Sequence, residues 1–274
     1  MANATLRMTK RNDVIPSGGR STPRGTCFSA NAKIRVMIRH ALPVSIFAIA
    51  LAQSPQAVEI TAEPHHHLVL QNSQVRVFYV DIPPQDSTLE HWHSHDYVYV
   101  SIGPAQIVNT IKGKDPAPGK LADGETGLAP GNFEHTVRNV STQPFRNVDV
   151  ELLQDDKLRA AAAAGKVHWD DERSLDVLHR GAGTKEILWV KDGVRATEIE
   201  LKPGGMLPMQ RHDLPFVFIA ISDGELGEHF STDVHRPELG HFKAGDVKWL
   251  SGHYSHSIMN TGHSPVKFVT LEFP

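Results

Sequence analysis

From about residue 68 to the C-terminus, the chain alternates short apolar runs with polar turns. Three of these runs, at residues 74–82, 96–102 and 216–221, are rich in the β-branched and aromatic side chains that are typical of strands. Clusters of proline and glycine separate such runs, at residues 83–84, 116–119, 130–131 and 203–205. Many short strands divided by such turns predict an all-β barrel or sandwich.

One segment departs from this pattern and favours a helix. Residues 154–166 include alanines at 160–164, which gives the segment strong helix propensity. The segment has no apolar stripe along one face. We therefore expect a short surface helix that begins a linker between two domains.

A candidate export signal lies near the N-terminus. Three basic residues precede an apolar run of 12 residues at positions 41–52, which is too short for a helix that spans a bilayer. The run ends in Ala-Leu-Ala, a pattern that suits signal peptidase, so we expect cleavage after Ala52 and export to the periplasm or the medium. The long polar stretch before Met37 leads us to expect that translation starts at Met37. The alternative is that residues 41–52 form a buried core helix.

Charge and cysteine content limit the kinds of partner and metal site that we expect. Residues 1–52 carry eight of the 28 basic residues and one of the 31 acidic residues, so the remaining chain has a net charge of −10. An acidic body without a helix-turn-helix pattern gives no support for nucleic-acid binding. The single cysteine, Cys27, lies in the leader, so the mature chain would have no cysteine-based zinc site. No second apolar stretch is long enough to anchor the chain in a membrane after signal cleavage.

The chain contains an internal repeat. Residues 68–84 match residues 187–203 at a fixed offset of 119, which also carries His93 onto His212. Further along, the offset becomes 121 and aligns Gly124 with Gly245, Gly131 with Gly252, His135 with His256 and Asn139 with Asn260. Chance rarely keeps one register across so many positions of these types. We therefore expect two homologous domains, at about residues 60–153 and 180–274.

The 17 histidines include a set with the spacing of metal ligands. His91 and His93 are two residues apart, so on a strand they face the same side. His135 arrives on a distant strand after a Pro-Gly turn. Asp96 begins the next apolar strand, and its parity places it with Val98 on the face that we expect to line the barrel interior. Imidazoles suit Zn, Fe, Ni, Cu or Mn, and a carboxylate favours the harder ions, so these residues predict a divalent metal site.

Other polar residues nearby are expected to lie outside this site. Tyr97 and Tyr99 have the opposite parity to Asp96, so they should face outward. The tract of three histidines at residues 65–67 resembles a metal-binding tract, but consecutive residues on a strand alternate in direction. We therefore expect this tract to be a surface segment that leads into the barrel.

A rival register would pair His93 with His95 instead of His91. In that register Asp96 would be directly adjacent to the second histidine and would face the opposite way. We prefer His91 with His93 because the repeat keeps His93 as His212.

The histidine spacing resembles the cupin superfamily, whose two motifs read G-x5-H-x-H-x3,4-E-x6-G and G-x5-P-x-G-x2-H-x3-N. His91 and His93 match the H-x-H core, six residues separate Asp96 from Gly103 as in the first motif, and His135 is followed four residues later by asparagine. Two departures are visible. Asp96 replaces glutamate and only two residues separate it from His93, and no residue separates the proline and glycine of the turn.

The resemblance covers both repeats, about 200 residues, and implies two tandem jelly-roll barrels, that is, a bicupin. The expected organisation is an export signal with an upstream extension at residues 1–52, cupin domain 1 with the metal site at 53–153, a linker with a short helix at 154–179, and cupin domain 2 at 180–274.

The second repeat departs further from the motif. Its four ligand positions become Gln210, His212, Pro215 and His256. Glutamine is a weak ligand and the proline side chain cannot coordinate, so we expect a degenerate site that is metal-free or weakly binding. His253 and His263 could substitute as ligands, although neither fits the motif.

The resemblance limits the possible functions but does not distinguish among them. A cupin-like centre keeps coordination positions open, which allows a dioxygenase, an isomerase, a decarboxylase or a non-catalytic binder. We expect an exported protein that binds a divalent ion (Fe, Mn, Ni, Cu or Zn) in its N-terminal barrel and acts as a dioxygenase-like enzyme on a small organic substrate. The alternative is a non-catalytic cupin that binds a small ligand or a metal. Cupins often associate through sheet edges, which allows a homodimer.

Overall fold

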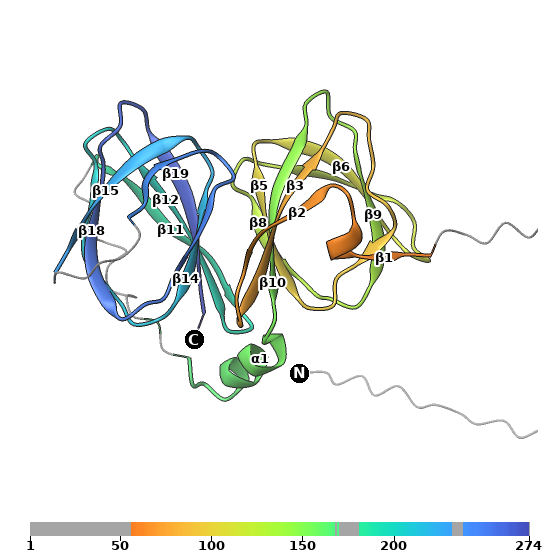
Figure 1. Cartoon of the computed structure of the whole chain (residues 1–274), viewed down its shortest axis with the longest axis horizontal. Coiled ribbons are helices and arrows are strands. Elements are labelled where there is room, and N and C mark those ends of the chain that lie inside the picture. Colours follow the sequence, from red (N-terminus) through yellow and green to blue (C-terminus); the bar gives the residue numbers. More distant parts are fainter. Residues whose placement is uncertain (1–55, 168, 170–180, 232–237, 274) are drawn as a thin grey trace, which may run out of the picture. The chain divides into compact units, whose positions relative to one another are not determined.

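The computed structural model describes residues 56–167, 169, 181–231 and 238–273. The candidate export signal lies outside the described residues, as does part of the expected linker. Strands dominate, and they form four sheets, two in each half of the described chain (Figure 1). The expected all-β architecture with two tandem barrels is confirmed. No helix in the described ranges has the length and hydropathy that a bilayer crossing requires.

Two five-stranded sheets form the first barrel. Sheet 1 has the order β1 (Val58–Glu59), β4 (His91–Trp92), β9 (Glu134–Asn139), β6 (Ala105–Ile111) and β7 (Ala117–Leu121). Sheet 2 has the order β2 (His66–Gln71), β3 (Val75–Ile82), β10 (Phe145–Leu152), β5 (Tyr97–Ile102) and β8 (Thr126–Ala129). A 3-10 turn, η1 (Ile60–Ala62), connects β1 to β2. Only the short β1–β4 pair is parallel among these described strands.

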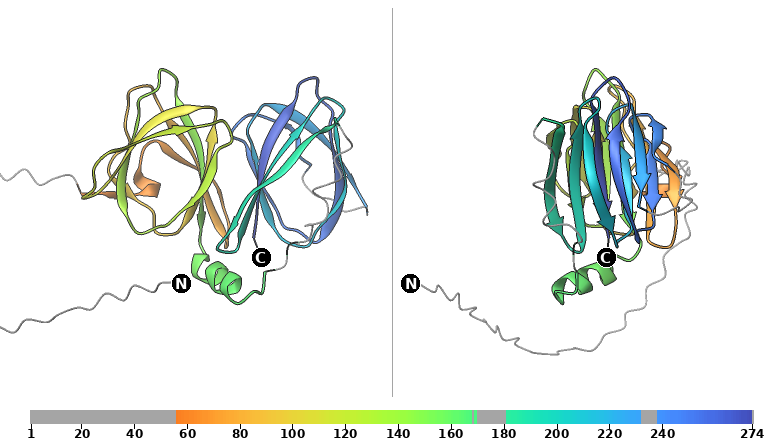
Figure 2. Two further views of the ribbon diagram at one scale, coloured as in Figure 1. Left: turned by 180° about the vertical axis from the view of Figure 1, so that it is seen from behind. Right: turned by 90° about the vertical axis from the view of Figure 1, so that its left-hand side faces the viewer.

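The second barrel repeats this plan with one strand fewer among the described residues. Sheet 3 has the order β11 (Gly183–Lys191), β12 (Val194–Leu201), β19 (Val266–Glu272), β14 (Phe216–Ala220) and β17 (Val247–Leu250). Sheet 4 has the order β13 (Met206–His212), β18 (Tyr254–Asn260), β15 (Gly224–Phe230) and β16 (Gly240–Phe242). The helix α1 (Asp155–Ala163) follows β10 directly, as the alanine-rich segment predicts (Figure 2).

Residues that the repeat aligns play the same structural parts in both halves. The side-chain amides of Asn139 and Asn260 each donate, at 2.9 Å, to the carbonyl of the last residue of β3 or β12. Gly131 and Gly252 each stand against backbone: a Cβ on Gly131 would lie 2.4 Å from the carbonyl of His95, and one on Gly252 would lie 2.6 Å from the backbone of Leu214. Since a side chain cannot fit at either place, glycine is required in both turns.

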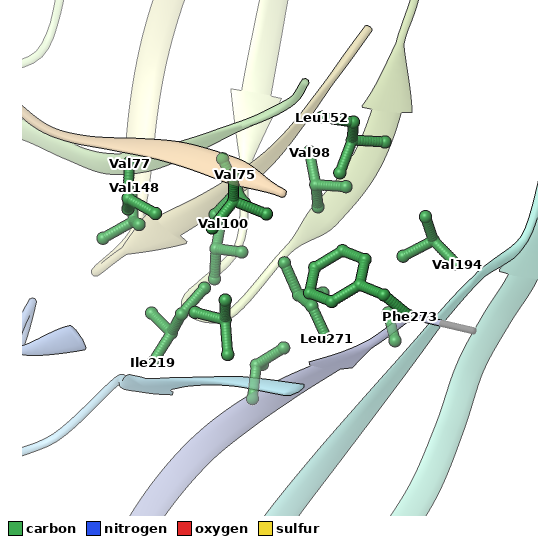
Figure 3. Packing of buried hydrophobic residues seen from close by; sticks show 14 of the residues in the cluster. Val75, Val77, Val98, Val100, Val148, Leu152, Val194, Ile219, Leu271 and Phe273 are labelled. Atoms are coloured by element: carbon green, nitrogen blue, oxygen red, sulfur yellow. The ribbon is translucent and has the colours of Figure 1, made fainter. Parts of the chain in front are cut away.

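The largest apolar cluster lies between sheets 2 and 3 rather than inside a barrel. Val98 and Val100 of β5 pack there with Ile219 of β14 and Leu271 of β19 (Figure 3). The indole of Trp189 also donates across to the carbonyl oxygen of Thr126, at 3.3 Å. The more apolar side of β5 therefore faces the other half of the molecule, and its other side faces the interior of its own barrel.

The two barrel interiors are filled differently. The apolar cluster inside the first barrel is small and centres on Val80, Ile82, Ala105 and Phe145. The second barrel has a larger interior cluster that includes three phenylalanines of sheet 3, at positions 216, 218 and 268. This difference leaves more room for a cavity in the first barrel than in the second.

Candidate metal centre

Three of the predicted ligands come together inside the first barrel. His91 on β4 pairs directly with His135 on β9, and their ring centroids are 4.4 Å apart. The ring of His93 lies 5.5 Å from each of these two rings. All three side chains are buried, and the most exposed of them, His135, has a relative exposure of 4%.

Hydrogen bonds fix the tautomers of His91 and His135. Nδ1 of His91 lies 2.9 Å from the carbonyl oxygen of Leu89, and Nδ1 of His135 lies 3.0 Å from Oδ1 of Asn109. Because these oxygens only accept, each Nδ1 carries the proton and each Nε2 keeps a lone pair. Both Nε2 atoms are buried without a hydrogen-bond partner among the described residues. An unmet buried polar atom costs about 1–3 kcal/mol, so a metal ion bound by these atoms fits the site.

The ring of His93 is held by an aromatic neighbour and a carboxylate. It stacks on Tyr97 with a centroid distance of 3.9 Å and an interplanar angle of 10°. Its Nδ1 lies 3.4 Å from Oε1 of Glu151, within ion-pair distance but without hydrogen-bond geometry. The other oxygen of Glu151 accepts from Nε of Arg76 at 2.7 Å. The expectation that Tyr97 faces outward is therefore wrong, because the inner side of β5 is the side that carries Tyr97.

His66 joins the cluster, which corrects the expectation of a surface tract at residues 65–67. Ligand atoms of His66, His91 and His93 all lie within 4.8 Å of one another, a grouping that could hold a metal ion. A strand sends alternate residues inward, so in a tract of three histidines the middle one can point inward while its neighbours point out. That alternation is the sequence signal that identifies His66, and its pairing with Val80 of β3 places it on the inner side of β2.

Two carboxylates flank His66. Nδ1 of His66 lies 2.5 Å from Oε2 of the buried Glu63, and Nε2 lies 3.5 Å from Oδ2 of Asp149. Burial alone would lower the pKa of His66, but the hydrogen bonds to Asp149 and Glu63 outweigh it and raise the pKa to about 9. Glu63 also accepts from the backbone N–H groups of His65 and Leu89. Glu63 could not be identified from the sequence, because a single glutamate ahead of a strand does not indicate a role in a site.

Asp96, the predicted carboxylate ligand, lies elsewhere. Its carboxylate accepts from the backbone N–H of Gly131 at 2.9 Å and from the guanidinium of Arg159 in α1. The expectation that it lines the barrel interior assumed that the apolar side of β5 faces inward. That side instead packs against the second barrel, so Asp96 and Val98 share the outer side.

Burial keeps two of the histidines neutral. Desolvation, followed by the charge of nearby histidines, lowers the pKa of His91 to about 4 and that of His135 to about 2. Neutral imidazole is the form that binds metals. At neutral pH both side chains are therefore already in the form that a metal requires.

A cavity of about 550 Å³ adjoins these histidines inside the first barrel. His66, His91 and His135 contribute to its wall, and most of the remaining lining is aliphatic or aromatic. The volume lies within the range of small-molecule sites. A small molecule in this cavity would therefore lie against the cluster.

The corresponding place in the second barrel is nearly closed. The rings of His212 and His256 are nearly perpendicular, with their Nε2 atoms 3.2 Å apart. Nε2 of the buried Gln210 has no hydrogen-bond partner in the described part of the chain. Nδ1 of His256 is bound to Glu228 at 2.7 Å. The cavity there measures about 30 Å³. The weaker second site predicted at Gln210, His212 and His256 thus has the residues together but little room beside them.

The fold and the histidine cluster define a class of protein: two tandem barrels of the cupin type, the first of which has a buried imidazole cluster facing a cavity. Solved structures of this class resemble the chain, and their similarity supports the bicupin fold. No protein-family model matches the chain, and comparison with curated proteins gives no match.

The solved structures include 11S globulins and an oxalate decarboxylase. Procruciferin, an 11S globulin from Brassica napus, has a TM-score of 0.56 and 13% identity over 73% of this chain and 77% of its own. Oxalate decarboxylase from Bacillus subtilis has a TM-score of 0.52 and 14% identity over 73% of this chain and 68% of its own. The 11S globulin from Wrightia tinctoria has a TM-score of 0.54 and 10% identity over 73% of this chain and 75% of its own. At these identities the likeness concerns the fold alone.

Proposed function

We propose that the first barrel binds a divalent metal ion through His91, His93 and His135, with His66 as a fourth imidazole ligand once the ion displaces the proton from its Nε2. The observation that carries the proposal is the pair of buried Nε2 atoms, on His91 and His135, without hydrogen-bond partners in the described ranges. A set of imidazoles suits Zn, Cu, Fe or Ni, whereas Mn prefers carboxylate and water oxygens. Asp96 has no part in this proposal, because its carboxylate is bound to Arg159 and Gly131.

The chain supplies the supports that metal-binding histidines commonly have. A carbonyl at Leu89, an amide at Asn109 and a carboxylate at Glu63 each accept from Nδ1 of a different ring. Such partners fix the tautomer and the direction of the ring, and they raise the basicity of the ligand nitrogen. These three rings are thereby held in place before any ion arrives, and the fourth, that of His93, is stacked on Tyr97.

The activity that we propose is that of a metal-dependent oxidoreductase of dioxygenase type acting on a small organic molecule. The ion would supply Lewis-acid or redox chemistry to a molecule in the adjoining cavity. The support for this activity is the largely apolar cavity, whose walls would exclude water from a bound substrate. The second candidate is a non-catalytic small-ligand binder, favoured by the 11S globulin from Wrightia tinctoria, whose structure reveals an auxin binding site.

Export is part of the proposal. Its support is the basic stretch followed by the 12-residue apolar run that ends at Ala52. N-terminal sequencing of the native protein would find Gln53 first. Retention of residues before Met37 in that protein would contradict the proposal.

Metal content tests the central claim. The purified full chain should contain a stoichiometric transition metal by mass spectrometry, and the His91→Ala, His93→Ala double variant should lose it. His241→Ala is the matched control, because that side chain is 82% exposed and lies outside the cluster. A folded wild-type protein that takes up none of Zn, Cu, Fe, Ni or Mn would overturn the proposal.

Oxygen consumption separates the two candidates. The metal-loaded protein should consume oxygen with enediol or catechol-like compounds, and the double variant should not. A protein that retains its metal and binds such compounds without consuming oxygen would be the non-catalytic binder.

A further inference from the structure

The cavity of the first barrel holds a polar atom that none of the metal ligands explains. Asn147 on β10 lines the cavity and has a relative exposure of 4%. Its Nδ2 donates to Oδ1 of Asp149 at 2.5 Å. Because a carboxylate only accepts, the amide nitrogen must face Asp149, and Oδ1 of Asn147 is the end left over. That oxygen is buried and has no hydrogen-bond partner among the residues described.

The walls around this acceptor are largely apolar. Val80, Ile82, Ile107, Val137 and Phe145 are among the residues that line the cavity. They offer a surface of aliphatic and aromatic carbon to whatever fills the space. A bound molecule would therefore have to be mostly apolar, since polar groups along its body would lose their hydrogen bonds to water.

The second barrel shows that the fold does not require this acceptor. At the offset of 121, Asn147 corresponds to Phe268, whose side chain is buried in the interior cluster of that barrel. Similarly, Tyr97 and Tyr99, which line the cavity, correspond to Phe216 and Phe218 at the offset of 119. The corresponding strands thus enclose phenylalanine side chains in the second barrel. In the first barrel they enclose a cavity with a buried acceptor that has no hydrogen-bond partner in the described residues. An unmet buried acceptor is destabilising, so its presence points to a ligand that satisfies it.

We infer that the first barrel takes a small, mostly apolar molecule that carries a hydroxyl or N–H donor, and that this donor bonds to Oδ1 of Asn147. The inference deepens the proposed function and rests on it, because His91 and His135 line the same cavity. The apolar body of the molecule packs on the cavity wall, and its donor fixes its orientation beside the histidine cluster. A molecule of the same shape without the donor leaves the acceptor unmet and binds more weakly.

Two probes with the same ring system test this inference on the full chain. 2-Naphthol carries a hydroxyl donor, and 2-methoxynaphthalene carries the same ring system without one. We expect 2-naphthol to bind about tenfold more tightly, as measured by fluorescence titration or calorimetry. Asn147→Leu should abolish this preference while leaving the binding of 2-methoxynaphthalene unchanged or stronger. Thr270→Val, a change on the corresponding strand of the second barrel, is the matched control and should keep the preference.

The outcomes separate this inference from the proposed function. Equal affinity of the wild-type protein for the two probes, or failure to bind either, overturns the inference without any need for a variant that folds. A preference that survives in Asn147→Leu overturns it as well. The titrations are made with metal-loaded and with chelator-treated protein, and metal content is measured separately. Absence of metal with a preserved preference would contradict the metal centre alone, and a metal-containing protein without a preference would contradict the ligand class alone.

Discussion

Lys185 on β11 holds in the second barrel the position that His66 on β2 holds in the first. His66 pairs with Val80 and Lys185 pairs with Ile199, and both pairs are related by the repeat offset of 119. Nζ of Lys185 lies 3.3 Å from Oε1 of Gln210. The charge of this lysine helps to lower the pKa of His212 to about 3, after burial and the charge of His256. A fixed ammonium group thus stands beside the remaining histidines, where the first barrel offers an imidazole.

The first prediction follows from the presence of Lys185 in place of a histidine and concerns the number of metal ions bound. The wild-type chain should bind a single equivalent of metal, because the Lys185 charge repels a cation and Gln210 is a weak ligand. The Lys185→His, Gln210→His double variant should gain a second equivalent, as measured by mass spectrometry after dialysis. Lys185→Met is the control and should gain none, because it removes the charge without adding a ligand. Two equivalents in the wild-type protein would contradict the prediction.

The second prediction concerns the support of His66. Glu63→Gln removes the carboxylate that accepts from Nδ1 of His66, so the ring should lose its orientation and basicity. Metal affinity should fall about 10–100-fold, as measured by competition with a chelator. Glu90→Gln changes a partly exposed glutamate that contacts only Lys112 in the described ion pairs, so it serves as the control. Equal affinity in Glu63→Gln and the wild-type protein would show that His66 is not a ligand.

The third prediction concerns the free energy of unfolding of the metal-free protein at acid pH. His91 and His135 have pKa values of about 4 and 2 in the folded state, against 6.5 for an unperturbed histidine. The unfolded chain therefore takes up protons first, and stability present above pH 6.5 is lost as the pH falls toward 4. Urea unfolding of chelator-treated protein across this range measures the effect. His241→Ala should follow the wild-type curve, whereas a flat curve in the wild-type protein would contradict the assigned neutral state.

At alkaline pH, the free energy of unfolding should instead fall as the pH rises. The pKa of His66 is raised to about 9, so its pairing with Asp149 and Glu63 contributes stability that is fully present below pH 6.5. This stability is lost as the pH rises through 9. His66→Gln should remove this alkaline loss in the metal-free protein, and it should also weaken the acid loss, because the charge of His66 helps to lower the pKa of His91. An unchanged alkaline loss in this variant would assign the loss to another group.

The fourth prediction concerns a buried ion pair that occurs in both barrels. Arg76 donates to Glu151, and at the aligned positions Arg195 donates to Glu272. Since Glu151 is fully buried, Arg76→Met would leave its charge uncompensated and cost about 3–5 kcal/mol of unfolding free energy. Arg195→Met should cost a similar amount.

Denaturant unfolding measures the effect of both substitutions. Arg211→Met changes an exposed pair with Asp213 and should change stability little, so it is the control. A small effect of Arg76→Met would mean that Glu151 is neutral or that another group compensates it.

The fold was predictable because its signals are redundant. Short strands, turn residues and the repeat all point to two barrels, and the glycine at position 131 recurs at 252 because backbone occupies the space beside both. The histidines at 91, 93 and 135 were predictable for the same reason, since strand parity and motif spacing agree on them. These residues belong to elements whose local pattern and tertiary role coincide.

His66 was placed wrongly because alternation along a strand excludes the whole tract from one site but still lets its middle residue point inward. Asp96 and Tyr97 were placed wrongly for a different physical reason. Parity along β5 tells which residues share a side but not which side faces the barrel interior. In this chain the more apolar side packs between the barrels, so the usual expectation of an apolar interior inverts the assignment. Asn147 and Glu63 could not be found from the sequence, because their roles depend on hydrogen bonds between distant strands.

The apolar cluster between sheets 2 and 3 makes the stability of each half of the protein depend on the other. The valines of β5 that make this contact would meet water if residues 180–274 were removed, and a patch of that kind promotes aggregation. The second half could therefore lose its ligands without becoming dispensable. The second barrel therefore covers the apolar side of β5 whether or not it binds a metal itself, and we expect the first barrel alone to be prone to aggregation.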